Sequence, residues 1–130
     1  MPMILNVRSC TPKTTTHRRN NAMTVQNLCD TFGWTILTEG DLTREVTGCY
    51  CGDLLSWVMS KAQDGDCWLT VMGNINAVAV AVLTDCACIV LTERAALDDE
   101  AKARAEQQGV TILTTDMNAY QAAVALSKVL

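Results

Sequence analysis

Apolar residues recur along this chain with two alternating periods. Short runs of apolar and β-branched residues, typical of strands, alternate with stretches in which apolar residues return every three or four positions, typical of helices. Three of the short runs begin near residues 67, 88 and 110, a spacing of about 21–22 residues that suits a compact β–α–β unit. The pattern predicts an α/β fold, a three-layer α/β/α domain with a mainly parallel sheet.

Five segments are predicted to be helices and five to be strands. Thr24 is a suitable N-cap for the first helix, and Gly33 and Gly109 are suitable ends for the first and the fourth. The predicted helices are residues 24–33, 53–65, 76–85, 97–109 and 117–130. The predicted strands are residues 34–40, 44–52, 67–72, 88–92 and 110–116.

For two of these helices, the sequence predicts which residues face the core. Asp53 is expected to be the N-cap of the second helix, because its short carboxylate follows a glycine and precedes an apolar run. The residues expected to face inward are Leu54, Val58 and Ala62 in the second helix and Met117, Tyr120 and Val124 in the last.

Periodicity alone does not distinguish a helix from a strand over residues 76–85. Alanine and valine alternate strictly from Ala77 to Val82, which is the period of a strand, but both residue types are apolar and the alternation marks no polar face. A strand follows almost at once, and two parallel strands need a crossover between them. The segment is therefore predicted to be a buried helix opened by Asn74 or Asn76.

Charge is divided unevenly between the first residues and the rest. Residues 1–22 carry four basic residues and no acid, whereas residues 23–130 carry all 14 acids and the other six bases. We expect 1–22 to be a disordered basic arm and 23–130 to be one folded domain. An alternative interpretation of the arm is an upstream extension of a chain whose natural start is Met23. An acidic domain repels phosphate backbones, so nucleic acid is not expected as a partner.

The composition favours a cytoplasmic protein. No stretch reaches the roughly 18 uninterrupted apolar residues of a membrane span, and the first residues do not form a secretory signal, so no membrane partner is expected. Seven cysteines, an odd number scattered through apolar segments, do not suggest a disulfide framework.

Known catalytic signatures are missing from the sequence. There is no phosphate loop, no dinucleotide-binding glycine motif and no nucleophile elbow, and the single histidine, His17, lies in the basic arm. The chain is therefore predicted not to be an enzyme and to need no cofactor. An enzyme of unrecognised type would use Asp53 and Tyr50.

The run TGCYCGDLL, residues 47–55, raises the question of cysteine chemistry. A Cys-x-Cys pair is poorly suited to closing on one metal ion, since structural zinc sites usually space their cysteines by two to four residues. Buried cysteine packs as a small apolar residue, and this interpretation is preferred, with no metal site. The alternative is a metal or redox protein that uses Cys49, Cys51, Cys67, Cys86 and Cys88.

Residues 48–92 carry a resemblance to a known family. A Gly-x-Tyr-x-x-Asp-Leu-Leu-Ser turn and helix, a strand after an acidic turn, an Asn-led Val/Ala helix and a further β run together resemble the DRTGG domain family. The similarity extends over roughly residues 24–130. The name-giving Asp-Arg-Thr-Gly-Gly run is missing, and Glu93, Arg94, Ala95 and Ala96 stand where a glycine-rich loop is expected, which puts ligand contacts by that loop's amides in doubt.

The resemblance implies a fold like the N-terminal domain of HPr kinase/phosphorylase, without its kinase domain. Relatives are attached to CBS-domain pyrophosphatases or phosphotransacetylases, or stand alone, and tend to pair through this domain. A regulatory or assembly role follows, with a homodimer, a possible partner enzyme and a small anionic or nucleotide ligand. Tryptophan and the Ala/Val helix add apolar surface for pairing, and Trp57 is the expected interface residue.

The ligand is expected between the segments GCYCGD and GNIN, near the ends of two predicted strands, where α/β folds place ligands. Each candidate also has a structural explanation as a turn glycine, a helix cap or a core aromatic. The candidate ligand-binding residues are Gly48, Tyr50, Gly52, Asp53, Ser56, Asn74 and Asn76.

Overall fold

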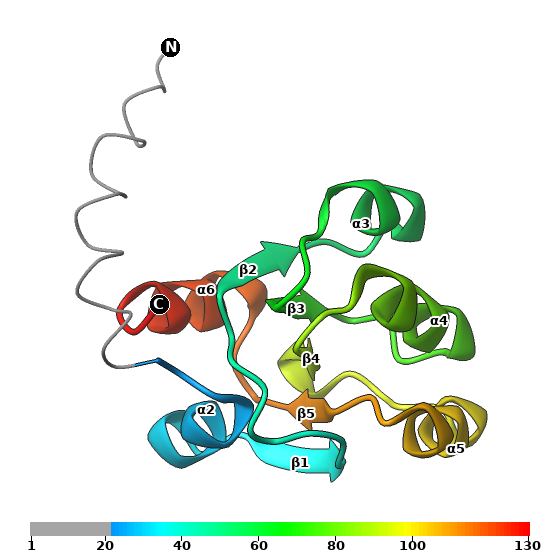
Figure 1. The fold of residues 1–130 in the computed structure, drawn as a ribbon, viewed down its shortest axis with the longest axis horizontal. Coiled ribbons are helices and arrows are strands. Elements are labelled where there is room, and N and C mark those ends of the chain that lie inside the picture. Colours follow the sequence, from blue (N-terminus) through cyan, green and yellow to red (C-terminus); the bar gives the residue numbers. More distant parts are fainter. Residues whose placement is uncertain (1–21) are drawn as a thin grey trace, which may run out of the picture.

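A computed structural model describes residues 22–130 and places a five-stranded sheet between two layers of helices (Figure 1). The predicted basic arm, with His17, lies outside these residues except for its last position. The strands are β1 (Thr35–Thr38), β2 (Gly48–Cys51), β3 (Asp66–Thr70), β4 (Cys88–Leu91) and β5 (Ile112–Thr114). The helices are α2 (Val25–Phe32), α3 (Leu55–Lys61), α4 (Ile75–Thr84), α5 (Asp99–Gln108) and α6 (Ala119–Ser127), with a short 3-10 helix η2 (Thr92–Arg94).

The sheet has the strand order β1-β5-β4-β3-β2. Strands β2 to β5 are parallel to their neighbours, and β1 is added antiparallel to β5. The predicted fold class, α/β with a mainly parallel sheet, is confirmed. Within the part of the chain that the structure describes, no helix has the length and apolar character needed to cross a lipid bilayer.

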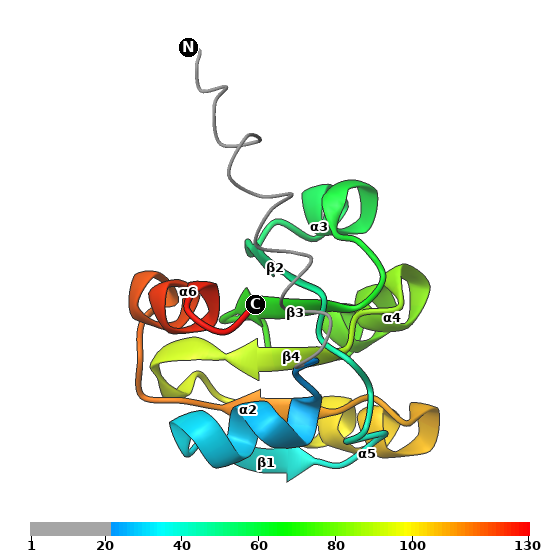
Figure 2. The same cartoon turned by 60° about the vertical axis from the view of Figure 1, so that its left-hand side comes forward.

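Helices cover both faces of the sheet and bury its centre (Figures 1 and 2). Helices α3, α4 and α5 pack on one face around Trp68 and Ile89, whereas α2 and α6 pack on the other around Leu69 and Val90. Every residue of β3 and β4 is buried, which explains why these strands read as continuous apolar runs. The three predicted layers are present.

Several helix ends match the capping residues that the sequence suggests. Thr24 and Asn27 form a reciprocal capping box at the start of α2, and Gly33 ends that helix in the left-handed region. The Asn74 side chain accepts a hydrogen bond from the Ala77 amide, 2.9 Å, so α4 begins after Asn74 and not at Asn76. Gly109 ends α5 with φ 70°.

Three predictions about α3 and α6 are wrong. Helix α3 begins after Leu54 without any side-chain cap, because the Asp53 carboxylate is bound elsewhere. Leu54 is 61% exposed, and Val58 is the buried residue of this helix. Tyr120 is 76% exposed, since α6 turns Ala122 and Leu126 toward the sheet instead.

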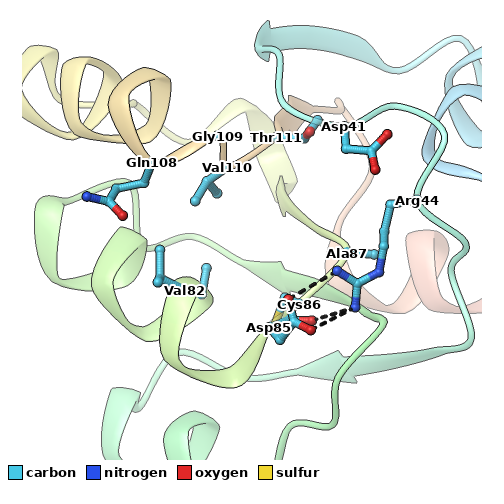
Figure 3. A pocket seen from close by; sticks show the side chains of 11 residues that line it. Asp41, Arg44, Val82, Asp85, Cys86, Ala87, Gln108, Gly109, Val110 and Thr111 are labelled. Atoms are coloured by element: carbon cyan, nitrogen blue, oxygen red, sulfur yellow. Dashed lines mark hydrogen bonds and ion pairs between the residues drawn. The ribbon is translucent and has the colours of Figure 1, made fainter.

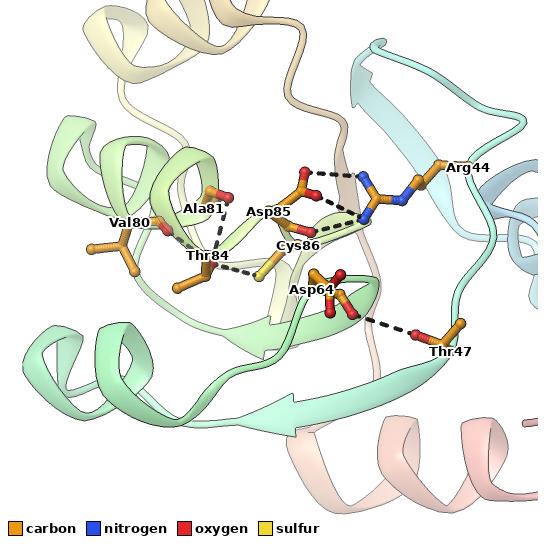
Figure 4. A network of polar contacts seen from close by, with 8 residues as sticks. All are labelled: Arg44, Thr47, Asp64, Val80, Ala81, Thr84, Asp85 and Cys86. Carbon is orange, nitrogen blue, oxygen red and sulfur yellow. Dashed lines mark hydrogen bonds and ion pairs between the residues drawn. The ribbon is translucent and has the colours of Figure 1, made fainter.

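The connection between β1 and β2 is fastened to the end of α4 by Arg44. Its guanidinium donates to both carboxylate oxygens of Asp85, at 3.1 and 3.2 Å, and to the Asp85 carbonyl oxygen, 3.0 Å (Figure 4). Asp85 is the C-cap of α4 in the left-handed region, φ 57°, so Arg44 also places a cation at the negative end of the helix dipole. This contact holds the connection across one end of the sheet.

Asp66, the first residue of β3, is a carboxylate held in a buried position. Its side chain accepts a hydrogen bond from the Gln63 amide, 2.8 Å, and the residue is 7% exposed. Burial raises the pKa of the Asp66 carboxyl, and the nearby Asp64 adds to the effect. The fold therefore favours the protonated form of Asp66 relative to the unfolded chain.

We expect Asp66→Asn to stabilise the protein at neutral pH. A carboxyl whose pKa is raised by folding contributes its full stability below the unfolded pKa of about 3.9 and loses it as the pH rises through the folded pKa. Asparagine keeps an acceptor for Gln63 and removes this loss. Thermal midpoints should therefore be higher for the variant at neutral pH, with the difference shrinking toward about pH 4.

The matched control is Asp64→Asn, which removes a charge at an exposed neighbouring position. Its effect should be smaller, since it removes the repulsion on Asp66 but also a favourable interaction with Arg44. Equal or lower stability of Asp66→Asn at neutral pH would show that the buried charge does not destabilise the fold.

Candidate functional site

Asp53 joins the end of β2 to the end of β3. Its Oδ1 accepts hydrogen bonds from the Thr70 hydroxyl, 2.7 Å, and from the Val71 amide, 2.9 Å. The preceding Gly52 donates its amide to the Leu69 carbonyl, 3.2 Å, and accepts the Trp68 indole N–H, 2.9 Å. Two polar groups from buried positions of β3 are thus satisfied by the segment that leaves β2.

The segment after β3 is held from the other side by the turn that precedes α5. The Gly73 carbonyl accepts from the Asp98 amide, 2.9 Å. A Cβ at Gly73 would lie 2.0 Å from the Ala96 carbonyl oxygen, so the close approach of the two backbones requires glycine here. Asn74 follows directly and caps α4, which fixes the first turn of that helix at the same end of the sheet.

The predicted ligand-binding residues do not all lie together. Gly52, Asp53 and Asn74 lie at the carboxyl ends of β2 and β3, as expected. Gly48 is at the opposite end of β2, about 13 Å away along the strand, and leaves room for the Asp66 carboxylate, which a Cβ would meet at 2.6 Å. The other three candidates are Tyr50, half-buried on the α3 and α4 side, and Ser56 and Asn76, both exposed.

An apolar patch lies beside Asp53. Leu54, Trp57 and Val71 are 61%, 58% and 41% exposed. Their backbones lie close to Asp53, because Asp53 binds the Val71 amide and the Trp57 amide donates to the Leu54 carbonyl. Lys61 lies over the Trp57 ring, 5.2 Å from its centre. We refer to Leu54, Trp57 and Val71 below as the apolar patch.

The backbone amides of the loop after β4 are hydrogen-bonded to other parts of the fold. Glu93 and Arg94 adopt left-handed backbone angles, φ 55° and 51°, which are uncommon for residues with a side chain. The Glu93 amide donates to the Met117 carbonyl, 2.8 Å, and the Arg94 amide to the Thr115 carbonyl, 2.9 Å. These donors are therefore engaged within the fold and do not point to an anion.

Two hollows lie away from the predicted residues. One of about 150 Å³ is next to the Arg44–Asp85 contact, between the ends of α4 and α5 (Figure 3). The other, about 470 Å³, lies near the start of β1 and the end of β5 and has the size of a small-molecule site. Its lining includes Phe32, Trp34, Arg94, Asp116 and Met117. Sequence analysis missed this hollow, because its residues come from distant segments without a motif.

The cysteines occupy two different environments. Cys67 and Cys88 are buried and in register on adjacent strands, where thiols fill space. Cys49 and Cys51 are exposed on β2, and a hydrogen bond from the Cys49 thiol lowers the pKa of Cys51 to about 7 while the pKa of Cys49 is raised. Between residues 22 and 130, no three cysteine, histidine or acidic side chains are arranged to hold a metal ion.

Comparisons with known proteins agree with the fold. The family model described as the DRTGG domain matches residues 27–129. No curated protein matches the chain. Among solved structures, the chain is similar to the CBS and DRTGG domains of the regulatory region of Clostridium perfringens pyrophosphatase, complexed with its activator diadenosine tetraphosphate, with a TM-score of 0.68 and 14% identity. The similarity covers 82% of this chain and 47% of that one, so the chain corresponds to less than half of the pyrophosphatase region.

We expect Asp53→Ala to lower the free energy of unfolding by about 1–2 kcal/mol, because the buried Thr70 hydroxyl and the Val71 amide lose their shared acceptor. Asp53→Asn keeps one side-chain oxygen and should cost less than half as much. Urea unfolding at equilibrium measures both. Equal losses in the two variants would mean that the negative charge, and not the acceptor geometry, provides the stabilisation.

Proposed function

The chain belongs to the DRTGG domain family, and from this membership we propose that it is a non-catalytic regulatory or assembly module that pairs with a second copy of itself and responds to a nucleotide or another small anion. The family match over residues 27–129 supports the regulatory class. The similar pyrophosphatase region is regulatory and binds a nucleotide activator, which motivates the ligand and a partner enzyme.

The observation that carries the proposal is the apolar patch. Leu54, Trp57 and Val71 expose large apolar side chains at one end of the sheet, and none of them is among the buried residues of the core. Grouped apolar side chains on a surface are typical of protein interaction sites, and tryptophan is enriched among the residues that dominate binding energy. A symmetric homodimer is the commonest way to cover such a patch.

Two places suit a nucleotide. The first is the predicted one around Asp53 and Asn74, where the Ile75 and Asn76 amides at the start of α4 lack partners within the helix and are suited to phosphate. The second is the hollow of about 470 Å³, which combines the Arg94 guanidinium with Phe32. Arg94 is paired with Asp116 at 3.3 Å on an exposed surface, so a phosphate would compete with that carboxylate.

A role without catalysis suits the groups in the predicted site. The Asp53 carboxylate is engaged by Thr70 and Val71, and the Tyr50 ring packs with the core residues around Trp68. Neither side chain is poised to act on a substrate.

The six thiols of the described residues are free, which suits a reducing compartment such as the cytoplasm.

We expect the protein to be a dimer that Trp57→Glu converts to a monomer, because a carboxylate inside a desolvated apolar interface costs several kcal/mol. Multi-angle light scattering over a concentration series gives the mass. Tyr120→Glu is the matched control, since Tyr120 is also an exposed aromatic residue, on α6 and outside the patch. A wild-type monomer, or dissociation by both variants alike, would contradict pairing through the patch.

We expect adenine nucleotides to bind, with affinity reduced at least tenfold, about 1.4 kcal/mol, in Asp53→Ala and unchanged in Cys51→Ala. Asp53 fixes the positions of the segments that would hold the phosphates through its bonds to Thr70 and Val71, whereas the Cys51 side chain takes no part in these bonds. Isothermal titration with ATP and diadenosine tetraphosphate measures the affinity. Loss of binding in Arg94→Ala alone would move the ligand to the larger hollow, and no binding by wild type would leave only the assembly role.

A further inference from the structure

Strand β2 is an open edge of the sheet. It pairs with β3 alone, and Gly52 turns its amide toward β3. Because alternate residues of a parallel strand face the neighbour, the backbone groups of Cys49 and Cys51 face away from β3. Among the residues described, no backbone group bonds to these outward N–H and C=O groups. The strand also lacks the charged side chains and prolines that usually protect such an edge.

The sequence of this edge is a palindrome. Residues 48–52 read Gly-Cys-Tyr-Cys-Gly, with Tyr50 at the centre. If a second copy pairs antiparallel about a two-fold axis at Tyr50, then Gly48 faces the partner's Gly52 and Cys49 faces the partner's Cys51. The outward groups of Cys49 and of the partner's Cys51 are then in the position to exchange both hydrogen bonds of an antiparallel pair.

We propose that two copies of this chain join their sheets through antiparallel pairing of β2 with the partner's β2, about a two-fold axis at Tyr50. A second copy is the proposed occupant, because two identical edge strands can pair antiparallel about a two-fold axis with the same surface on both sides, and the palindrome then sets glycine opposite glycine and cysteine opposite cysteine. A segment of unrelated sequence would gain the backbone bonds but not the matching of residue types. This inference rests on the self-association in the proposed function and specifies its geometry.

The surroundings of the edge suit the same partner. Tyr50 lies on the α3 side of the sheet, among residues of the core that includes Trp68. The apolar patch begins directly after β2, at Leu54, so it flanks the proposed seam. Cys49 and Cys51 alternate with Tyr50 and therefore face the α6 side, together with Cys67, the register partner of Cys49. The small cysteine side chains leave the edge accessible.

The proposed pairing brings thiols within bonding reach. Opposed residues in a hydrogen-bonded antiparallel pair have Cα atoms about 5.5 Å apart, inside the disulfide range of about 4.4–6.8 Å. Cys51, with its pKa of about 7, supplies the thiolate at neutral pH. With a diazene oxidant such as diamide, the Cys51 thiolate adds to the N=N bond. The adduct nitrogen takes up one proton. The partner's Cys49 gives up its proton and attacks the Cys51 sulfur as the thiolate, so that the S–S bond forms, the S–N bond breaks and the hydrazine leaves with two protons.

A mixing experiment tests the register of the pairing. In a Cys10→Ser background, Cys49→Ser and Cys51→Ser are prepared separately, one of them with a mass tag, and oxidised alone or after mixing. Each variant alone should lose covalent dimer at least tenfold, because every disulfide needs one Cys49 and one Cys51. The mixture should regain it, and only between one tagged and one untagged chain.

The mixture also excludes a disulfide within one chain, since neither variant contains both cysteines. Covalent dimer from either variant alone, or none from the mixture, would overturn the proposed register.

A second measurement needs no oxidant. Cys49→Lys with Cys51→Lys places lysine opposite lysine twice across the two-fold axis, and light scattering should then give a monomer. Cys49→Ser with Cys51→Ser is the matched control and should remain a dimer, with circular dichroism confirming that both variants fold. A dimeric lysine variant would overturn the strand pairing.

The two failures are distinguishable. A wild-type monomer contradicts self-association as a whole. A wild-type dimer that Trp57→Glu dissociates, but that gives no mixed disulfide, leaves the proposed function intact and removes only the pairing of β2.

Discussion

The burial of β3 and β4 on both faces is the constraint from which the rest of the structure follows. With helices on either side, every polar group of these strands needs a partner inside the protein. The Trp68 indole N–H finds one in the Gly52 carbonyl, and the Thr70 hydroxyl finds one in Asp53. The segment that leaves β2 is thus positioned by the hydrogen-bonding needs of the core. The apolar patch, which begins at Leu54, takes its place from these same bonds.

Local signals in the sequence were sufficient for most of the fold. Thr24, Gly33, Asn74 and Gly109 act within one helical turn of their own positions, so their roles follow from neighbouring residues. The spacing of apolar runs likewise determined the α/β class, because parallel strands need crossover helices. The Ala/Val segment was assigned correctly from topology, although its alternation alone suggests a strand.

The sequence was insufficient where the deciding partner is distant along the chain. Asp53 looks like a helix cap, but Thr70 and Val71, 17 and 18 residues away, take its carboxylate. Leu54 therefore lies at the surface and does not pack in the core, so its apolar side chain is not a sign of burial. Tyr120 was misplaced for another reason: the rotation of α6 is set by which of its residues are small enough to approach the sheet, and Ala122 meets that need. The candidate ligand-binding residues are separated for a related reason. Gly48 and Gly52 are close in sequence, but they lie at opposite ends of one strand.

Cysteine shows how strand order gives one residue type two roles. Cys67 and Cys88 occupy central strands and act as small apolar residues, whereas Cys49, in register with Cys67, lies on an edge strand and is exposed. The spacing of the cysteines does not reveal this difference, since it depends on which strand ends the sheet.

The buried cysteine pair also gives the protein an internal probe of its own opening. A thiol reagent reaches Cys67 or Cys88 only when the centre of the sheet separates from its helices, whereas Cys49 and Cys51 are open to it in the folded state. The ratio of labelling rates within one molecule, corrected for the reactivity of each thiol, therefore yields the free energy of that separation without an engineered cysteine. The same measurement can thus show whether a change at the edge strand alters how often the centre of the sheet opens.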